Sequence, residues 1–201
     1  MLLSRQTKKK TPTSPEKQRI ANSDFHTFVD KTDYTGALAI LSSKKRNGNA
    51  DLKTLLWIAY CKSHLDQNDK AIKDYKEILE ICKKSSSSSS LNLLEGYNKK
   101  ETIGYVLTLL AVSYFINGEY LQSKKYAERA QEFCSPIHKK LAIRVLFHVS
   151  HKLDDEQTLF EYHSELEDTL ENQLSLASIH FMRTHYQEAV DLYKKLLTDN
   201  R

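Results

Sequence analysis

Three histidines have the spacing that comes closest to metal-binding chemistry. His148 and His151 lie three residues apart on one face of a predicted helix, and His163 follows on the next predicted helix. Imidazole nitrogens bind zinc, but a zinc site also needs partner ligands at a suitable spacing. No cysteine or carboxylate has such a spacing here. We therefore expect structural histidines and no bound metal.

Carboxylate pairs could in principle support general acid and base catalysis. Asp154 is followed by Asp155, and one residue separates Glu165 from Glu167. Both pairs fit solvated ends and faces of helices. The five glycines are scattered, and the motifs G-x-G-x-x-G, G-x-x-x-x-G-K, G-x-S-x-G and H-E-x-x-H are absent. We expect a protein that is not an enzyme and needs no cofactor.

The cysteines and the apolar segments indicate a reducing compartment and no membrane insertion. Cys61, Cys82 and Cys134 form an odd set without a C-x-x-C pair. The longest apolar stretch is residues 103–116, and its 14 residues fall short of the about 20 that a membrane-spanning helix needs. The opening sequence MLLSRQTKKK lacks the apolar core of a signal peptide.

The basic charge of the chain is concentrated at its start. The formal net charge is +4, but residues 1–19 carry +5 and the remainder carries −1. Residues 1–13 have no helical periodicity and are predicted to form a disordered basic arm. A solvated arm is favoured over binding of Lys8 to Lys10 to phosphates, an anionic membrane or acidic tubulin tails. We expect no nucleic-acid partner.

A repeat with a period of about 34 residues organises the rest of the chain. Small residues recur on the second helix of four predicted pairs, at Ala37, Ala71, Ser123 and Ala189. The interval from Ala71 to Ser123 is 52 residues, 18 more than one repeat. We assign the surplus to a flexible Ser-rich loop at about residues 83–100.

Residues at fixed positions of this repeat match the packing signature of tetratricopeptide helix pairs. Small residues stand where two helices cross, and aromatic residues fill the grooves between them. The signature residues are Ala37, Ala59, Ala71, Tyr75, Ala111, Tyr114, Ser123, Ala127, Ala130, Ala177, Tyr186, Ala189 and Tyr193. One unit is irregular, with Phe147 where a small residue is usual and Leu159 at the crossing position.

The pattern predicts an all-α protein. Residues 14–201 should form a right-handed tetratricopeptide-repeat superhelix, an α-solenoid of about five helix pairs, two of them degenerate. Solenoids normally end in a polar capping helix, and none follows the last predicted pair. We expect either that the chain is the N-terminal segment of a longer array or that a partner covers this end.

The first helices of the repeats supply the candidate binding surface. Trp57, Tyr60, Tyr105 and Val112 are more apolar and aromatic than charged, which suits docking of a helix or peptide. The same residues could instead form core between repeats, and the sequence leaves both interpretations open.

Several strings exceed what a generic repeat requires, and through them the chain resembles the intraflagellar transport protein 56 family. The strings are Asp33 to Ala37, Leu56 to Cys61, Leu146 to Lys152, Gln173 to Arg183, His185 to Ala189 and Asp199 to Arg201. Leu3-Ser4-Arg5 and the lysine run after it are also similar.

The resemblance implies a non-enzymatic scaffold of the intraflagellar transport B complex, which kinesin-2 carries into cilia and flagella. It implies a role in cilium assembly and in transport of motility components, and contacts with other B subunits, subunit 46 above all. It places the protein in the cilium or flagellum, the basal body and the cytoplasm. It also implies further repeats after Arg201.

The alternative is a co-chaperone-type module that binds the acidic C-terminus of a chaperone. Such a module needs Lys, Arg and Asn on the first helices of its repeats to hold a carboxylate. The second and third repeats instead offer Leu56, Trp57, Tyr60, Tyr105, Thr108, Leu109 and Val112. This composition favours the scaffold.

The repeat register can be tested at one crossing position. We expect Ala189→Leu to lower the free energy of unfolding by about 1–3 kcal/mol, because a larger side chain overpacks the crossing. Thermal unfolding of the variant beside the parent chain measures this, and an unchanged melting temperature would count against the register.

Overall fold

The computed structural model describes residues 24–84 and 97–199. In these ranges the chain forms ten α-helices and no strand. The helices are α2 (His26–Asp30), α3 (Tyr34–Arg46), α4 (Leu52–His64), α5 (Asn68–Lys84), α6 (Lys99–Ile116), α7 (Tyr120–Phe133), α8 (Pro136–Lys152), α9 (Glu156–Ser164), α10 (Leu170–Met182) and α11 (Tyr186–Asp199). The predicted basic arm at residues 1–13 and the serine run at residues 85–90 lie outside the described residues.

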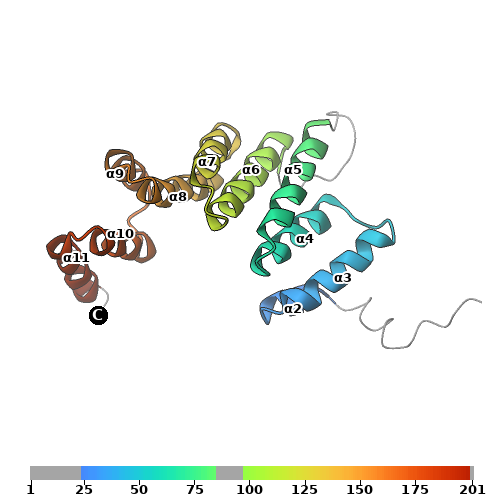
Figure 1. Ribbon diagram of the computed structural model, residues 1–201, viewed down its shortest axis with the longest axis horizontal. Coiled ribbons are helices and arrows are strands. Elements are labelled where there is room, and N and C mark those ends of the chain that lie inside the picture. Colours follow the sequence, from blue (N-terminus) through green and yellow to red (C-terminus); the bar gives the residue numbers. More distant parts are fainter. Residues whose placement is uncertain (1–23, 85–96, 200–201) are drawn as a thin grey trace, which may run out of the picture.

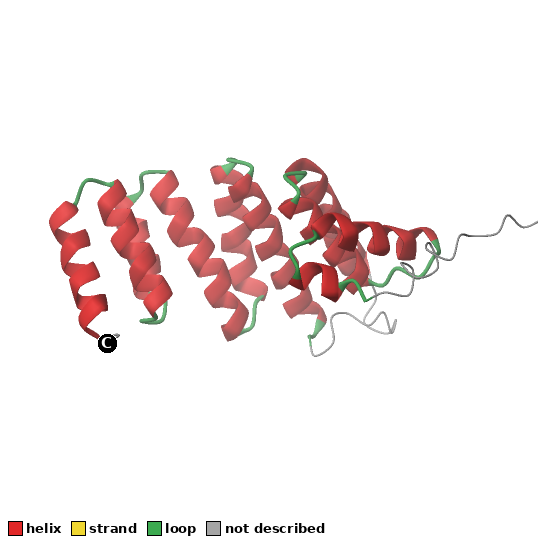
Figure 2. Ribbon diagram, turned by 90° about the horizontal axis from the view of Figure 1, so that it is seen from below, coloured by secondary structure: helices red, strands yellow, loops and turns green. Residues whose placement is uncertain are grey.

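Consecutive helices pair antiparallel, and the pairs stack along the long axis of the molecule (Figures 1 and 2). The five pairs are α2–α3, α4–α5, α6–α7, α8–α9 and α10–α11. The predicted all-α tetratricopeptide superhelix is therefore confirmed. None of the helices in the described ranges combines the length and the hydropathy needed to cross a bilayer.

Side chains that accept hydrogen bonds from free backbone amides define where several helices begin. At the start of α4, the Asp51 carboxylate accepts a hydrogen bond from the Thr54 amide at 2.7 Å. At the start of α6, Asn98 and Glu101 form a capping box, in which each side chain accepts from the backbone amide of the other. These caps satisfy amides that a helix leaves without an internal partner.

Each pair turns from its first to its second helix through one residue in the left-handed backbone region. The φ angles are 58° at Thr32, 55° at Asp66, 79° at Gly118, 60° at Asp154 and 65° at Thr184. The same conformation at equivalent places shows that the turn is a property of the repeat. Only the third pair has glycine there, although glycine adopts this conformation without a steric penalty.

The positions where the two helices of a pair cross are almost fully buried. Five residues after each left-handed residue, the second helix places Ala37, Ala71, Ser123, Leu159 and Ala189, none of them more than 1% exposed. In the third pair the Ser123 hydroxyl donates a 2.8 Å hydrogen bond to the Ala111 carbonyl on α6. Small side chains thus allow the helix backbones to approach closely.

In the fourth pair, large side chains occupy the positions where the two helices cross, in place of small ones. Phe147 on α8 and Leu159 on α9 occupy its crossing positions, and both are completely buried. They form one apolar cluster with Leu176 and Ile179 of α10. The irregular unit recognised in the sequence therefore keeps the repeat architecture, but with larger side chains between its two helices.

Close approach also explains a glycine within α6. A Cβ atom on Gly104 would lie 2.7 Å from the backbone nitrogen of Cys134 and 2.8 Å from the carbonyl carbon of Phe133. Real Cβ atoms do not come this close to backbone, so only glycine fits where α6 meets the junction of α7 and α8. The glycine therefore lets the two helices of the third pair, α6 and α7, approach closely at this end.

The aromatic signature residues have two different environments. Tyr75 and Tyr114 are buried in the core between the second and third pairs. Tyr186 differs, because its side chain is 56% exposed and lies at the first residue of α11, against Phe181. Tyr193 is partly buried, and its hydroxyl lies 3.1 Å from that of Ser178. In the described ranges no helix follows α11 to enclose these two rings.

The last pair exposes apolar side chains at positions that are buried in the second pair. In the second pair these are Leu52, Leu56, Ile72 and Leu79, which pack with Val106, Leu107, Leu110 and Tyr114 of α6. In the last pair the equivalent residues are Leu170, Leu174, Val190 and Leu197, which are 46%, 39%, 43% and 70% exposed. One face of α10 and α11 is therefore equivalent to the face of α4 and α5 that packs against α6.

The strain in the turns predicts a stabilising substitution. Thr184 is β-branched, so the left-handed conformation is unfavourable for it. We expect Thr184→Gly to raise the free energy of unfolding by about 0.5–1 kcal/mol in urea denaturation. The reverse change, Gly118→Thr, is a matched control, because a Cβ atom there meets nothing within 4 Å and only backbone strain is added. It should destabilise the chain, and a loss of stability in Thr184→Gly would contradict the assignment of strain.

Candidate functional site

A wide hollow on the described surface is a groove between α4 and α6. It encloses about 480 Å³. Its lining residues are Lys53, Leu56, Trp57 and Tyr60 on α4, Tyr97 before α6, and Tyr105 and Leu109 on α6. We call this site the aromatic groove.

Helical spacing brings the α4 residues of the aromatic groove onto one face. Lys53, Trp57 and Tyr60 are separated by four and three residues, which places them above one another on successive turns. Tyr105 and Leu109 are likewise one turn apart on α6. Because α4 and α6 are the first helices of neighbouring pairs, stacking of the repeats sets the two faces side by side.

The structure brings together three of the four residues that the sequence put forward as partner-facing. Trp57, Tyr60 and Tyr105 line the aromatic groove. Val112 is partly buried and packs against the cluster of α8 that contains Val145 and Val149. Thr108 also points away, because it is buried and donates a hydrogen bond to the Gly104 carbonyl at 3.0 Å.

Sequence reasoning missed two lining residues. Lys53 lies one turn before Trp57, so the helical period could have identified it. Tyr97 precedes α6 in a segment without helical hydrogen bonding, and no periodic signal marks it. Its ring lies 6.2 Å from that of Tyr105, measured between ring centroids. Only the tertiary structure shows that it closes one end of the aromatic groove.

Contacts between rings fix the orientation of the groove side chains. The Trp57 and Tyr60 rings meet edge to face, with centroids 5.3 Å apart and planes at 83°. Phe25 lies 5.5 Å behind Trp57, and the Tyr60 ring lies 4.4 Å from His64. Such aromatic pairs each contribute about 0.5–1.5 kcal/mol beyond burial. The groove is therefore ordered before any partner binds.

The polar groups of the aromatic groove are hydrogen-bond donors at neutral pH. Burial raises the pKa of Tyr60 and of Tyr105, so both phenols keep their protons. Lys53 contributes an exposed ammonium group, and no carboxylate is among the described residues that line the site. The groove thus combines an apolar floor with a positively charged edge.

Comparison with known proteins identifies the family. The sequence model of the intraflagellar transport protein 56 family matches residues 55–201, a range that includes Trp57, Tyr60 and Tyr105. The chain belongs to the intraflagellar transport protein 56 family. The resemblance seen in the sequence strings is therefore confirmed.

A curated relative supports the assignment. The chain is 30% identical over 190 residues, 92% of its length, to an intraflagellar transport protein 56 homolog of Caenorhabditis elegans. It spans 29% of the length of that relative.

Solved structures that resemble this family member agree on the fold. One is a putative kinesin light chain of Podosopora anserina with nearly identical tetratricopeptide-like repeats, with a TM-score of 0.65, 14% identity, and coverage of 92% of this chain and 95% of that one. Another is a thermophilic tetratricopeptide repeat protein of Thermus thermophilus, with a TM-score of 0.62, 16% identity and 88% of each chain covered. At this identity the likeness concerns the fold alone.

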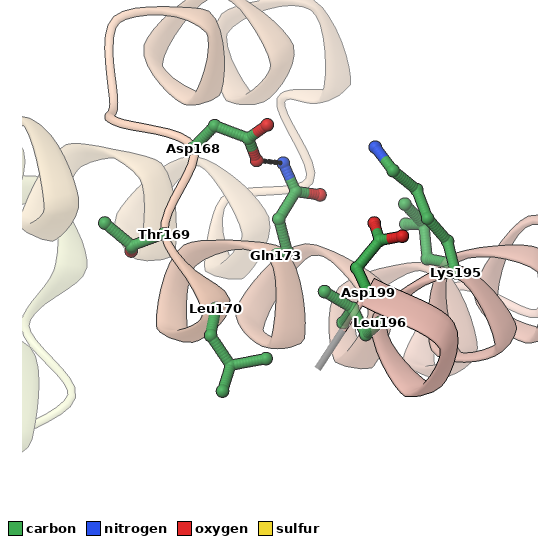
Figure 3. A pocket seen from close by; sticks show the side chains of 8 residues that line it. Asp168, Thr169, Leu170, Gln173, Lys195, Leu196 and Asp199 are labelled. Carbon is green, nitrogen blue, oxygen red and sulfur yellow. Dashed lines mark hydrogen bonds between the residues drawn. The ribbon is translucent and has the colours of Figure 1, made fainter. Parts of the chain in front are cut away.

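A second, smaller hollow in this family member occurs at equivalent positions of two helix pairs, and its lining residues differ between them. It measures about 170 Å³ and lies between the start of α10 and the end of α11, where the Asp168 carboxylate accepts a hydrogen bond from the Gln173 amide (Figure 3). A hollow of about 200 Å³ recurs in the second pair. Gln173, Leu192, Lys195, Leu196 and Asp199 of the first hollow correspond to Leu55, Asp74, Glu77, Ile78 and Ile81 of the second. Different side chains line the same place, so the shape belongs to the fold.

The histidines and carboxylates that could support chemistry have structural contacts. His148 packs against the rings of Phe115 and Phe147, and His163 packs against Phe147. The Asp155 carboxylate accepts hydrogen bonds from the amide and hydroxyl of Thr158 at the start of α9. In the described ranges no group of three or more His, Cys, Asp or Glu side chains is arranged to hold a metal ion.

The cysteines of this family member are free thiols. Cys61 and Cys82 are buried, and burial raises the pKa of Cys61 to about 11. A thiol of this pKa stays protonated at neutral pH and is a poor nucleophile. Cys134 is partly exposed, and burial also raises its pKa.

The histidines predict that acid destabilises the fold. Burial, followed by the charge of Arg144, lowers the pKa of His148 below its ordinary value of 6.5, and burial also lowers the pKa of His151, His163 and His180. Below pH 6.5 the unfolded chain therefore binds protons that the folded chain excludes, so stability falls as the pH decreases.

We expect the melting temperature to drop between about pH 7.5 and about pH 5.5, a range above the titration of ordinary carboxylates. His148→Gln should reduce this drop, because glutamine does not titrate. Equal melting temperatures at both pH values would contradict this account.

Proposed function

We propose that this chain is a non-enzymatic scaffold of the intraflagellar transport B complex. It holds other B subunits, subunit 46 first among them, and is carried with them by kinesin-2. It serves assembly of cilia and flagella and transport of motility components. Its places of action are the cilium or flagellum, the basal body and the cytoplasm.

The observation that carries the proposal is the aromatic groove in a chain of this family. Trp57, Tyr60 and Tyr105 converge on one ordered cavity from two repeats. Tryptophan and tyrosine at the centre of a concave site are the side chains that most often dominate binding between proteins. A scaffold needs such a surface and needs no catalytic group, which agrees with the structural roles of His148 and Asp155.

The co-chaperone alternative is supported less well by the same groove. A clamp for a C-terminal carboxylate requires several Lys, Arg or Asn side chains that converge on one point. Among the described lining residues, Lys53 is the only cation. The floor formed by Leu56 and Leu109 suits an apolar anchor better than a terminal carboxylate.

Affinity capture from an extract of a ciliated cell tests the proposal. The tagged chain should recover B-complex subunits at moderate salt. The double variant Trp57→Ala/Tyr105→Ala should recover about tenfold less, because it removes the central anchors. Tyr186→Ala is the matched control, since it removes an exposed aromatic ring outside the aromatic groove.

Circular dichroism establishes that each variant is folded before capture. Recovery of chaperones with acidic tails in place of B subunits would favour the alternative. A folded chain that recovers no transport subunit would contradict the scaffold role. Equal recovery of B subunits by the groove variant and the parent would show that the scaffold role does not depend on the aromatic groove.

A further inference from the structure

The chemistry of the aromatic groove specifies the kind of partner segment that it accepts. This inference rests on the proposed function, because it concerns the partner side of the same site. The described lining offers an ammonium group, an indole N–H and three phenol groups, but no carboxylate, amide or imidazole side chain. The side chains of Lys53, Trp57 and Tyr105 donate no hydrogen bond within residues 24–84 and 97–199. The ammonium and the indole N–H can only donate, so a partner must supply acceptors for them.

The nearest acidic side chains at the helix starts are already engaged. Asp51 accepts a hydrogen bond from the Thr54 amide at 2.7 Å, and Glu101 accepts one from the Asn98 amide at 3.0 Å. Both carboxylates are held at helix N-termini, where the helix dipole stabilises negative charge. Lys53 forms no ion pair with any residue of the described ranges. Burial opposes ionisation of Asp51, but the hydrogen bonds from Thr54 and then the charge of Lys53 lower its pKa. Because this interaction stops short of an ion pair, the Lys53 ammonium can still pair with a carboxylate from outside.

The rings that flank the aromatic groove add further nitrogen groups. His26 lies 5.4 Å from Trp57, His64 lies 4.4 Å from Tyr60, and His138 lies 5.7 Å from Tyr105, measured between ring centroids. None of these contacts brings a negative charge to the rim. Lys53 is therefore the one charged group among the described lining residues, and its positive charge favours an acidic segment over a basic one.

The dimensions of the groove indicate a helix. Tyr60 lies seven residues after Lys53 on α4, or about 10 Å along the helix at the rise of an α-helix. The apolar floor below this span comes from Leu56 and Leu109. Two large apolar side chains on neighbouring turns of a bound helix would cover this length, as in other helix-in-groove complexes.

We infer that the aromatic groove binds an acidic amphipathic helix of a partner protein. Two large apolar side chains, three or four residues apart, enter the cavity between α4 and α6. A glutamate or aspartate on the flank of the same helix pairs with Lys53.

The chain has a built-in reporter for this binding, because Trp57 is its only tryptophan and lines the aromatic groove. The probe is an end-capped Ala-based helical peptide of about 18 residues, without tryptophan, carrying two leucines four residues apart and flanking glutamates. A second peptide replaces each glutamate with lysine. Trp57 emission and anisotropy of a dye on the peptide are followed during titration of the 201-residue chain.

We expect the glutamate peptide to change Trp57 emission and to bind about tenfold more tightly than the lysine peptide. Lys53→Glu should reverse this preference. Lys125→Glu is the matched control, because Lys125 is an exposed lysine of α7 outside the groove, and it should leave the preference unchanged. Lys53 is exposed, so the variant retains the fold, which circular dichroism checks.

Equal affinity for the two peptides, or a preference that Lys53→Glu leaves unchanged, would overturn the inference. Binding of neither peptide would also overturn it. Since the titration contains no transport subunit, these results are distinct from a failure of the scaffold role, which the capture experiment decides.

Discussion

The close crossing of the two helices in each pair is the constraint on which the rest of the molecule depends. At Ala59 and Ala71 in the second pair no exposed surface remains, so the backbones of α4 and α5 lie as close as side chains allow. This contact fixes the direction of each helix relative to its partner. The left-handed residue in the turn, Asp66 in this pair, reverses the chain within the space available. Stacking of such helix pairs then produces the solenoid and its surfaces.

Stacking of these units builds the aromatic groove. The second and third pairs share a large apolar core to which Tyr75, Leu107 and Leu110 contribute, and this core holds α4 and α6 in register. The groove lies along the same two helices, so the residues that order the core also order the binding face. A rigid surface loses little conformational entropy when it binds a partner. The site is therefore preorganised by packing.

The junction between the fourth and fifth pairs is built differently, with ion pairs around a small apolar cluster. Arg183 lies 3.1 Å from Asp154 and 3.6 Å from Glu156, and Arg144 lies 3.9 Å from Glu171. Exposed ion pairs contribute little stability and are weakened by salt. Burial of apolar side chains therefore stabilises both junctions, and the apolar core beside the aromatic groove is the larger of the two.

The sequence by itself determined the helical repeat, its register and the resemblance to the family. These features are local or periodic, because a small residue at Ala71 and its equivalent at Ala189 report on the same contact within one pair. It also indicated that Trp57 and Tyr60 share a face, since both stand on one helix. The tertiary structure alone decided that Tyr97 closes the groove and that Val112, on the same helix as Tyr105, is covered by α8. The physical reason is that spacing along the chain fixes the face of a helix, whereas the neighbour that covers this face is fixed only when whole pairs stack.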